Sequence, residues 1–370
     1  MKRNIAIIIP GGIGTGHNNI GVPVLERIVK LLATDFNLIV FQLHPINETY
    51  KVEGFELIGC YSANPLLKSL KFILAFLKVH RKRKFQVAHG FWAFPSGFLA
   101  VLMGKIFKIK SIISLQGGDA IALPEIQYGQ LLKWLPRKLI LWALQQADEL
   151  ISPTRYMIDN LRNYGLTRNE VKYIPLGVDL LLFKFHEKKI EIPVRFLHIG
   201  NFNRVKDQAT LLKAFEVISR NISSQLIILG EGELENEIKS LALELKLRDK
   251  IIFHPTIPYE SLPRHYHQSD VLLHTSLSEG HPIVVEEAMS CGVLVCGTNV
   301  GLLYDHPACC VSVPVGDFQM LATEVLKLLQ DEKRMKLIRK NAYSWASAHS
   351  IHWTMSTISN LYEKLIRSHT

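Results

Sequence analysis

The stretch SDVLLHTSLSEGHPIVVEEAMSCG, residues 269–292, constrains the fold most, because it reads as one complete strand–loop–helix unit. Val271–Leu273 is a short apolar run typical of a buried parallel strand. The loop that follows is rich in serine and ends in Glu279 and Gly280, as turns often do. Pro282 suits the first turn of a helix, where its missing N–H costs nothing, and Gly292 favours the end of that helix. The sequence therefore predicts a βα unit of a parallel sheet here.

The chemistry of this loop favours an anion beside hydroxyl groups. A glycine-containing loop that enters a helix at the carboxyl end of a strand offers free N–H groups and the positive end of a helix dipole. We therefore expect a diphosphate at the loop–helix start formed by Gly280, His281, Pro282 and Ile283. Glu279 and Glu287 would repel phosphate, so hydroxyls of a sugar or a ribose are better partners for them. An ordinary βα unit with two solvated glutamates explains the same sequence equally well.

The spacing of the two glutamates carries a family resemblance. Seven residues separate Glu279 from Glu287 in EGHPIVVEEAMSCG, which resembles the Glu-x7-Glu signature of the GT4 group of retaining glycosyltransferases, the glycogen-synthase-like and mannosyltransferase-like enzymes. The resemblance implies the GT-B fold, two Rossmann-like, doubly wound α/β domains that face a cleft, with a C-terminal helix crossing back to the first domain. It also implies a nucleotide-sugar donor, with Glu279 near the sugar and Glu287 on the ribose hydroxyls.

Length and composition agree with two α/β domains. The chain has 370 residues, 48% of them hydrophobic and 21% charged, which is a globular composition. We expect an N-terminal acceptor-binding domain over residues 1–183 and a charged linker over 184–193. A C-terminal nucleotide-sugar-binding domain then spans 194–348, and a helix over 349–370 packs back on the first domain. No run approaches ~18 uninterrupted apolar residues, so no membrane-spanning helix is expected.

The net charge of the chain indicates which class of binding partner to expect. The formal charge of +10 favours a polyanionic partner. No DNA- or RNA-reading motif occurs, so nucleic acid is not expected and an anionic membrane surface is the better candidate. Residues 65–79 form an amphipathic helix, followed by the basic run HRKRK at 80–84, which is either a solvated face or a lipid-docking patch. The five cysteines lack a Cys-x-x-Cys pair, which predicts reduced thiols, no zinc site and a cytoplasmic protein.

The first loop of the chain is rich in glycine. The apolar run Asn4–Ile9 predicts a strand, and Gly12, Gly14 and Gly16 follow it. A dinucleotide-binding Gly-x-Gly-x-x-Gly pattern would need glycine at His17 or Asn19, so that function is disfavoured. By the family resemblance, the three glycines let the donor or the acceptor approach the backbone closely.

Two further stretches of the first half resemble the same family. HGFWAFPSG, residues 89–97, is similar to its His-x-x-Trp…Gly stretch, which implies that His89 and Trp92 lie on the acceptor side; core aromatics are an equally good explanation. QGGD, residues 116–119, stands where the family usually has His-Gly-x-Asp. Gln116 therefore replaces a histidine near the donor sugar and retains only a hydrogen bond to it, and Asp119 is assigned to the acceptor side.

The start of the second domain contains basic residues that can bind the donor diphosphate. After the strand RFLHIG, residues 195–200, the family has Gly-Arg-x4-Lys-Gly, whose arginine and lysine bind the donor diphosphate. Lys206 fits the lysine position as a point charge for a leaving diphosphate. Asn201 replaces the arginine, and Arg204 is close enough in sequence to take over its charge. A solvated loop lysine is the alternative.

The sequence as a whole predicts a retaining glycosyltransferase that needs no metal and no cofactor beyond its donor. No Asp-x-Asp occurs, so cationic and backbone donors are expected to stabilise the leaving diphosphate. The predicted acceptor is a glycan or a polyprenyl-diphosphate-linked glycan of envelope polysaccharide or lipopolysaccharide biosynthesis. The predicted location is cytoplasmic, or peripheral on the inner face of the cytoplasmic membrane. A GT-B nucleotide-sugar epimerase and a catalytically silent sugar-nucleotide or membrane-surface binding protein are the alternatives, the second because of Gln116 and Asn201.

Overall fold

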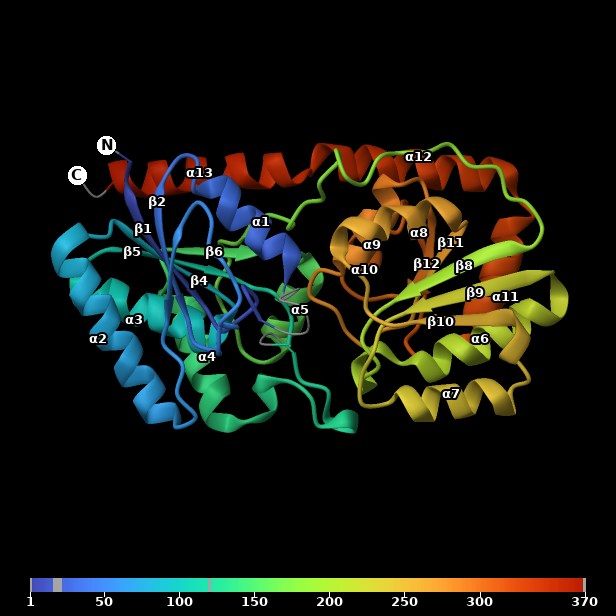
Figure 1. Cartoon of the computed structure of the whole chain (residues 1–370), viewed down its shortest axis with the longest axis horizontal. Helices are drawn as coiled ribbons and strands as arrows, with labels where there is room; N and C mark the ends of the chain where they lie inside the picture. The colour runs from blue at the N-terminus through green and yellow to red at the C-terminus, as the bar shows by residue number, and fades with distance from the viewer. Residues whose placement is uncertain (1, 16–21, 119–120, 369–370) are drawn as a thin grey trace. The chain divides into compact units, whose positions relative to one another are not determined.

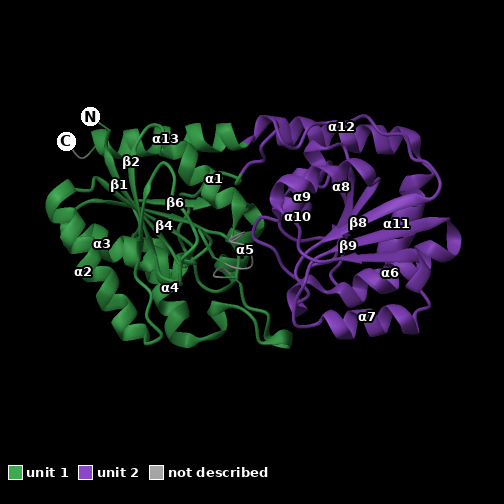
Figure 2. Cartoon of the chain, in the orientation of Figure 1, with its two compact units in different colours: residues 1–176, 351–370 green, residues 177–350 purple. Residues whose placement is uncertain are grey.

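The computed structural model describes residues 2–15, 22–118 and 121–368. The chain divides into two compact units, unit 1 with residues 1–176 and 351–370 and unit 2 with residues 177–350 (Figure 2). Each unit is a parallel sheet with helices on both faces (Figure 1). The prediction of two doubly wound α/β domains is therefore confirmed.

Unit 1 contains, over its described residues, a seven-stranded parallel sheet in the order β3-β2-β1-β4-β5-β6-β7. Its strands are β1 (Asn4–Ile9), β2 (Asn37–Gln42), β3 (Glu56–Gly59), β4 (Val87–Phe91), β5 (Lys110–Ser114), β6 (Glu149–Ser152) and β7 (Lys172–Tyr173). The central strand β1 is fully buried from Ile5 to Ile9, as expected for a sheet covered on both faces. The strand order reverses between β1 and β4, and the carboxyl ends at such a switch point are where α/β proteins bind ligands.

The helices of unit 1 include one from the far end of the chain. They are α1 (Pro23–Leu32), α2 (Pro65–Arg83), α3 (Phe98–Phe107), α4 (Trp134–Gln146), α5 (Arg155–Asn163) and α13 (Ile351–Arg367). α13 packs against α1 (Figure 1). Its buried Tyr362 meets the ring of Phe36 edge-on, with the centroids 5.2 Å apart. The last helix of the chain thus completes the core of the first unit.

Unit 2 repeats the same winding. Its described residues form a six-stranded parallel sheet in the order β10-β9-β8-β11-β12-β13, with the switch point between β8 and β11. The strands are β8 (Val194–Ile199), β9 (Ser224–Leu229), β10 (Ile251–His254), β11 (Val271–His274), β12 (Leu294–Thr298) and β13 (Val311–Val313). The predicted βα unit at residues 269–292 is β11 and the helix after it.

Two apolar clusters cover the faces of this sheet. The helices are α6 (Gln208–Asn221), α7 (Glu235–Glu244), α8 (Leu262–Gln268), α9 (Ile283–Ser290), α10 (Leu302–Asp305), α11 (Phe318–Leu329) and α12 (Glu332–Ala348). One cluster draws on α6, α7 and α11, the other on α8, α9 and α10, and α12 contributes to both. None of the helices in the described part of the chain combines the length and the apolar character needed to cross a bilayer.

Residues 184–193, the predicted linker, lie in unit 2. The Lys188 ammonium donates to the carbonyl oxygens of Tyr266 at 2.7 Å and His267 at 2.9 Å, and also to that of Ser269. These carbonyl groups belong to the end of α8, where a cation is favoured by the helix dipole. Burial lowers the pKa of Lys188 to about 8, against the opposing attraction of Asp270. This segment therefore runs along unit 2 as part of its packing.

Candidate functional site

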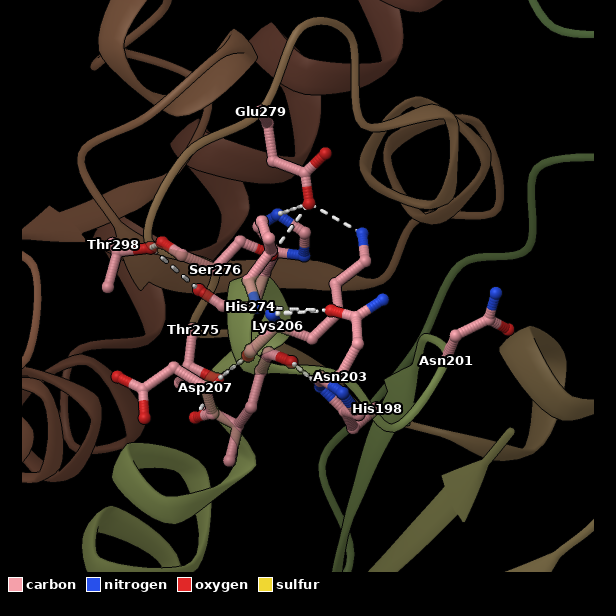
Figure 3. A network of polar contacts seen from close by, with 12 residues as sticks. His198, Asn201, Asn203, Lys206, Asp207, His274, Thr275, Ser276, Glu279 and Thr298 are labelled. Atoms are coloured by element: carbon pink, nitrogen blue, oxygen red, sulfur yellow. Dashed lines mark hydrogen bonds and ion pairs between the residues drawn. The ribbon is translucent and has the colours of Figure 1, made fainter. Parts of the chain in front are cut away.

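The switch point of unit 2 brings Lys206 and Glu279 together. Lys206 ends a single helical turn, η5 (Arg204–Lys206), in the loop after β8, and Glu279 lies in the loop after β11. The two loops are joined because the Leu277 N–H donates to the Val205 carbonyl oxygen at 2.8 Å. Lys206 Nζ lies 2.5 Å from Glu279 Oε1 (Figure 3). Two residues predicted from separate motifs are thus one ion pair at the expected edge of the sheet.

Glu279 is held as a carboxylate, and its Oε1 atom already has several polar partners. Ser276 Oγ donates to Glu279 Oε1 at 2.6 Å, and His274 Nε2 lies 3.4 Å from the same oxygen. Burial alone would raise the pKa of Glu279, but the Lys206 ammonium and His274 outweigh burial and bring the pKa well below its usual range. The side chains of Glu279 and Lys206 are 13% and 22% exposed. The Oε2 atom points away from these donors (Figure 3), which suits it to accept a hydroxyl group.

A capped turn sets the position of Lys206. Asn203 Oδ1 accepts from the N–H groups of Val205 at 3.1 Å and Lys206 at 3.2 Å, a typical side-chain cap. Thr275 Oγ1 donates to the carbonyl oxygen of Lys206 at 3.1 Å. The sequence analysis missed Asn203 and Thr275 as positioning residues, although an asparagine just before a short helical turn is a recognisable capping signal.

The loop that carries Glu279 is supported from β12 and from the segment after it. Thr298 Oγ1 donates to the Ser276 carbonyl oxygen at 2.6 Å (Figure 3). Gly301 has φ +54°, and a Cβ there would lie 2.9 Å from Pro282 Cδ and 3.1 Å from Glu279 Cβ. Gly301 thus permits a close approach that a side chain would prevent.

Two buried histidines lie beneath the ion pair, and neither was predicted. His198 lies in β8 and His274 is the last residue of β11, and the two are 0% and 1% exposed. His198 Nδ1–H donates to the Leu273 carbonyl oxygen at 3.0 Å, and burial lowers the pKa of His198 to about 3. The Nε2 atoms of both rings have no hydrogen-bond partner among the residues that the structure describes. Sequence analysis missed them because each lies inside an apolar strand run.

Helix α9 places Glu287 in the interior of unit 2. The side chain is fully buried, and its Oε2 accepts from the Tyr266 hydroxyl at 2.7 Å. Burial raises the pKa of Glu287 to about 8, although the tyrosine hydroxyl opposes that rise. The predicted contact between Glu287 and a ribose stays a prediction, and it requires that the hydroxyls reach this buried carboxyl group.

A second buried carboxyl group fixes the start of α9. His281 Nε2 lies 2.7 Å from Glu286 Oε2, and neither side chain is exposed. Pro282 is the N-cap, so His281 precedes the cap and Glu286 is the fourth helical residue. Apolar residues often pair at these two positions and set the angle at which a chain enters a helix. Here an ionisable pair makes that contact, and Glu286 was not among the predicted site residues.

The other predicted donor-side residues of unit 2 lie in the same two loops. Gly280 and Pro282 are buried and Ile283 is half-buried at the start of α9. Asn201 and Arg204 are exposed, and the Asn201 carbonyl oxygen accepts from Gln208 Nε2 at 3.0 Å. The structure thus collects Lys206, Arg204 and the 279–283 segment at one edge of the unit 2 sheet. Their roles toward a ligand stay predictions.

The glycine loop of unit 1 has an internal reason for its glycines. Gly12 has φ +109° and Gly14 has φ +57°, and a Cβ on Gly14 would collide with the ring of Tyr50. Gln42, which stands where a dinucleotide-binding chain needs an acid, bonds to the same loop: its Oε1 accepts from the Ile13 N–H at 3.1 Å, and its Nε2 donates to the Ile13 carbonyl oxygen at 2.9 Å. Two predicted site residues, Gly16 and Asp119, lie outside the described residues.

The predicted acceptor-side residues of unit 1 follow β4 and β5. His89 is fully buried, with its ring nitrogens 2.6 Å from the Tyr362 hydroxyl and 2.7 Å from Ser114 Oγ, and burial lowers its pKa to about 3. Both nitrogens are thus used within unit 1. Trp92 has φ +67°, a strained backbone conformation for a large side chain that occurs most often at functional sites. Gln116 is half-buried after β5, and the acceptor-side and donor-side roles stay predictions.

No group of three or more His, Cys, Asp and Glu side chains within residues 2–15, 22–118 and 121–368 is arranged to hold a metal ion.

Comparisons with known proteins identify both halves of the chain. Residues 33–177 match the family model "Glycosyl transferase 4-like domain" and residues 183–345 match "Glycosyl transferases group 1". The N-acetylgalactosamine-N,N'-diacetylbacillosaminyl-diphospho-undecaprenol 4-alpha-N-acetylgalactosaminyltransferase of Campylobacter jejuni is 24% identical over 347 residues, which are 87% of this chain and 91% of that protein.

Solved structures share the whole architecture. Sucrose-phosphate synthase from Thermosynechococcus elongatus aligns with a TM-score of 0.83 at 21% identity, covering 99% of this chain and 100% of that one. HepE of Anabaena, solved in complex with UDP, aligns with a TM-score of 0.77 at 16% identity, covering 98% and 100%. These likenesses establish the two-domain fold. With both domain models matched in order along the chain, the protein belongs to the group 1, GT4-like glycosyltransferases, as the glutamate spacing predicted.

Proposed function

We propose that the chain transfers a sugar, with retention of configuration and without a metal ion, from a nucleoside diphosphate sugar to a hydroxyl group of a glycan or a lipid-linked glycan. The observation that carries this proposal is the Lys206–Glu279 ion pair, 2.5 Å long, at the switch point of unit 2. An ammonium and a carboxylate in one place suit a donor that has a diphosphate at one end and sugar hydroxyls at the other.

The proposed donor pose assigns a role to each group at this edge. The diphosphate binds Lys206 and Arg204 and the first turn of α9 at Gly280–Ile283, where helix N–H groups lack intrahelical acceptors. Glu279 accepts from sugar hydroxyls through Oε2, and Glu287 accepts from the ribose. In the chemical step the acceptor hydroxyl attacks from the face that the diphosphate leaves, and the leaving phosphate takes the hydroxyl proton. Cationic and N–H donors stabilise the charge that develops on the departing diphosphate.

The relatives support a lipid-linked acceptor. The Campylobacter jejuni relative carries diphospho-undecaprenol in its name, and HepE was solved with UDP. We infer that the acceptor of this chain is a polyprenyl-diphosphate-linked glycan used for envelope polysaccharide or lipopolysaccharide. Work on such an acceptor favours a cytoplasmic protein that visits the inner face of the cytoplasmic membrane.

Helix α2 supports the proposal of an anionic membrane as partner. It buries Phe72 and Phe76 and turns its leucines outward, so that Leu66 is 81%, Leu70 50% and Leu74 57% exposed. One exposed face of α2 changes from leucine to basic residues along the helix. Its residues are three or four positions apart: Leu67, Lys71, Leu74, Lys78 and Arg81. Exposed leucines beside basic residues suit an interface of acyl chains and anionic headgroups.

The first experiment is thermal unfolding of the purified protein with a panel of nucleoside diphosphates and their sugars. Selective stabilisation by one nucleotide, lost in Glu287→Ala, supports the donor site and names the nucleotide. Stabilisation followed by turnover of the nucleotide sugar without any acceptor would identify an epimerase instead. Tight binding with no turnover, whatever acceptor is offered, would identify a binding protein.

Sugar transfer by variants tests the assigned roles. Lys206→Ala and Glu279→Gln are each expected to lower the transfer rate by about 10²-fold or more, since each removes a group that stabilises the transition state. The matched control is Lys239→Ala, which breaks an exposed Lys–Glu pair of 2.6 Å on α7 and should leave the rate unchanged. If Lys206→Ala and Glu279→Gln both kept the wild-type rate, the proposal of an active site at this edge of the sheet would be wrong.

A further inference from the structure

The Lys206–Glu279 pair cannot keep its present form when the proposed donor binds. Lys206 Nζ now lies 2.5 Å from Glu279 Oε1, and the two charges neutralise each other. A diphosphate at the start of α9 carries more negative charge than one carboxylate, so it draws the ammonium toward itself. The Glu279 side chain, only 13% exposed, then loses its cation. A carboxylate that is nearly buried and loses its partner is strongly destabilised, so another group must compensate.

His274 is the group in position to do so. Its Nε2 lies 3.4 Å from Glu279 Oε1, is buried, and has no hydrogen-bond partner among the described residues (Figure 3). Ser276 Oγ already donates to that oxygen at 2.6 Å, and a second donor is needed in place of Lys206. His274 lies at the end of an inner strand, opposite Gly297 of β12, and β11 also pairs with β8 through Val271 and Leu272. A short movement of the Glu279 side chain would bring Oε1 within hydrogen-bond distance of the ring.

We propose that His274 is a positioning residue for Glu279: when the donor diphosphate takes Lys206, the Nε2–H of the His274 ring donates to the carboxylate and holds it in place for the sugar. This inference rests on the proposed function. It predicts that nucleotide affinity depends on an N–H donor at position 274, because the buried carboxylate needs a new hydrogen bond once Lys206 has moved to the diphosphate.

The other histidine beside the ion pair cannot take this role. Burial lowers the pKa of His198 to about 3, and its Nδ1–H donates to the Leu273 carbonyl oxygen at 3.0 Å. The neutral His198 ring then has no hydrogen on Nε2, so it has no N–H left for Glu279. With Lys206 drawn to the diphosphate, the His274 Nε2–H is the donor that joins the Ser276 hydroxyl on the carboxylate.

The test is calorimetric titration of the full-length protein with UDP and, in parallel, GDP and ADP. Wild type is compared with His274→Leu, which has no donor, and His274→Gln, which keeps an N–H donor. We expect His274→Leu to bind about tenfold or more weakly than wild type, because Glu279 is left without a donor to replace Lys206. His274→Gln should restore most of that affinity, since its amide N–H can donate to the carboxylate.

Controls separate this inference from the donor site itself. His352→Gln, an exposed change on α13, should leave the affinity for nucleotide as in wild type. Thermal unfolding without nucleotide shows whether each variant is folded. Equal nucleotide affinity of wild type and His274→Leu, or a loss of affinity that His274→Gln fails to restore, would overturn the role of His274 and leave the donor site intact. Absence of binding by wild type for all three nucleotides would overturn the donor site, and this inference with it.

Discussion

Glu287 shows how burial changes the chemistry of a single residue. Burial raises its pKa from 4.5 to about 8, so the folded protein binds a proton there that the unfolded chain has released. Between these two values the folded state holds more protons, and the contribution of Glu287 to the free energy of unfolding therefore falls as pH rises. Above the folded-state pKa the full cost of a buried carboxylate is present, and below the unfolded-state pKa it is absent.

We predict that Glu287→Gln removes this pH dependence. The glutamine keeps an oxygen for the Tyr266 hydroxyl, which now donates at 2.7 Å. The melting temperature of the variant should rise relative to wild type as pH increases from about 5 to about 8, measured by thermal unfolding without nucleotide. A constant difference across this pH range would contradict the raised pKa. Gln330→Ala, an exposed change after α11 that involves no titratable group, is the control, and its difference from wild type should not vary with pH.

The sequence predicted the charged residues of the site better than the residues that support them. Lys206 and Glu279 could be predicted to meet because each follows a parallel strand at the switch point, whose carboxyl ends share one edge. His198, His274 and Glu286 could not, because each lies inside a run that alternation and length assign to a buried strand or helix. A buried polar residue is informative only when its partner across the fold is known.

At the scale of elements, the start of α9 depends on the His281–Glu286 pair. We predict that His281→Leu lowers the free energy of unfolding by about 3 kcal/mol, because it leaves the Glu286 carboxyl group buried without its partner. The double variant His281→Leu, Glu286→Leu should recover most of that loss, since two apolar side chains at these positions pack as a hydrophobic staple. Urea unfolding of the single and double variants measures both effects.

A matched exposed pair serves as the control for this cycle. Lys336 Nζ and Glu332 Oε1 on α12 lie 2.7 Å apart, the same distance, but the two side chains are 69% and 75% exposed. Lys336→Leu is expected to cause no measurable change in stability, because surface pairs contribute little. If His281→Leu were equally silent, or if the double variant were less stable than the single one, the pair would have no role in fixing α9.

Helix α2 carries the prediction about membranes. We expect wild type to bind vesicles that contain anionic lipid and to bind neutral vesicles much less, because the bases at its C-terminal end need anionic headgroups. The triple variant Leu66→Ser, Leu70→Ser, Leu74→Ser should lower the partition coefficient by about tenfold or more in a sedimentation assay, since it removes apolar groups that insert at the interface.

Two leucines of unit 2 provide the control for α2. Leu243 on α7 and Leu337 on α12 are 57% and 58% exposed, as much as Leu74. Serine at both positions should leave vesicle binding unchanged. Equal vesicle binding by wild type and the α2 variant would contradict the proposal that α2 binds membranes. If wild type were a dimer and the α2 variant a monomer, the exposed face of α2 would instead be an interface between copies of the chain.

Element bounds followed local signals where those were strong. α1 begins at Pro23 and ends at Leu32, because a proline at the first turn and a regular apolar period define it. α2 continues to Arg83, past the predicted end at Val79, since basic residues are favoured in the last turn of a helix. α12 was not predicted, because its buried face includes Arg339 among Met335, Ile338 and Ala342, which interrupts the apolar stripe.

The chain as a whole is organised by its last helix. Unit 1 is made of two separate stretches, residues 1–176 and 351–370, and unit 2 of one stretch between them. α13 supplies Tyr362, which is the hydrogen-bond partner of His89 Nδ1 at 2.6 Å. The family resemblance implied that a terminal helix returns to the first domain. Periodicity alone shows that a helix is amphipathic and leaves its partner unspecified.

We predict that a chain ending at Ser350 loses stability in unit 1 and keeps it in unit 2. Without α13, the apolar face of α1 and the buried His89 ring lose their cover, whereas the unit 2 core stays complete. Hydrogen exchange should show faster exchange for β1, β2 and β4 and unchanged exchange for β8, β11 and β12. The full-length Tyr362→Phe variant isolates the hydrogen bond and should cost about 1–3 kcal/mol in unit 1, because it leaves a buried ring nitrogen unpaired. Protection of β1 and β4 equal to that of the full chain would show that unit 1 folds without its last helix.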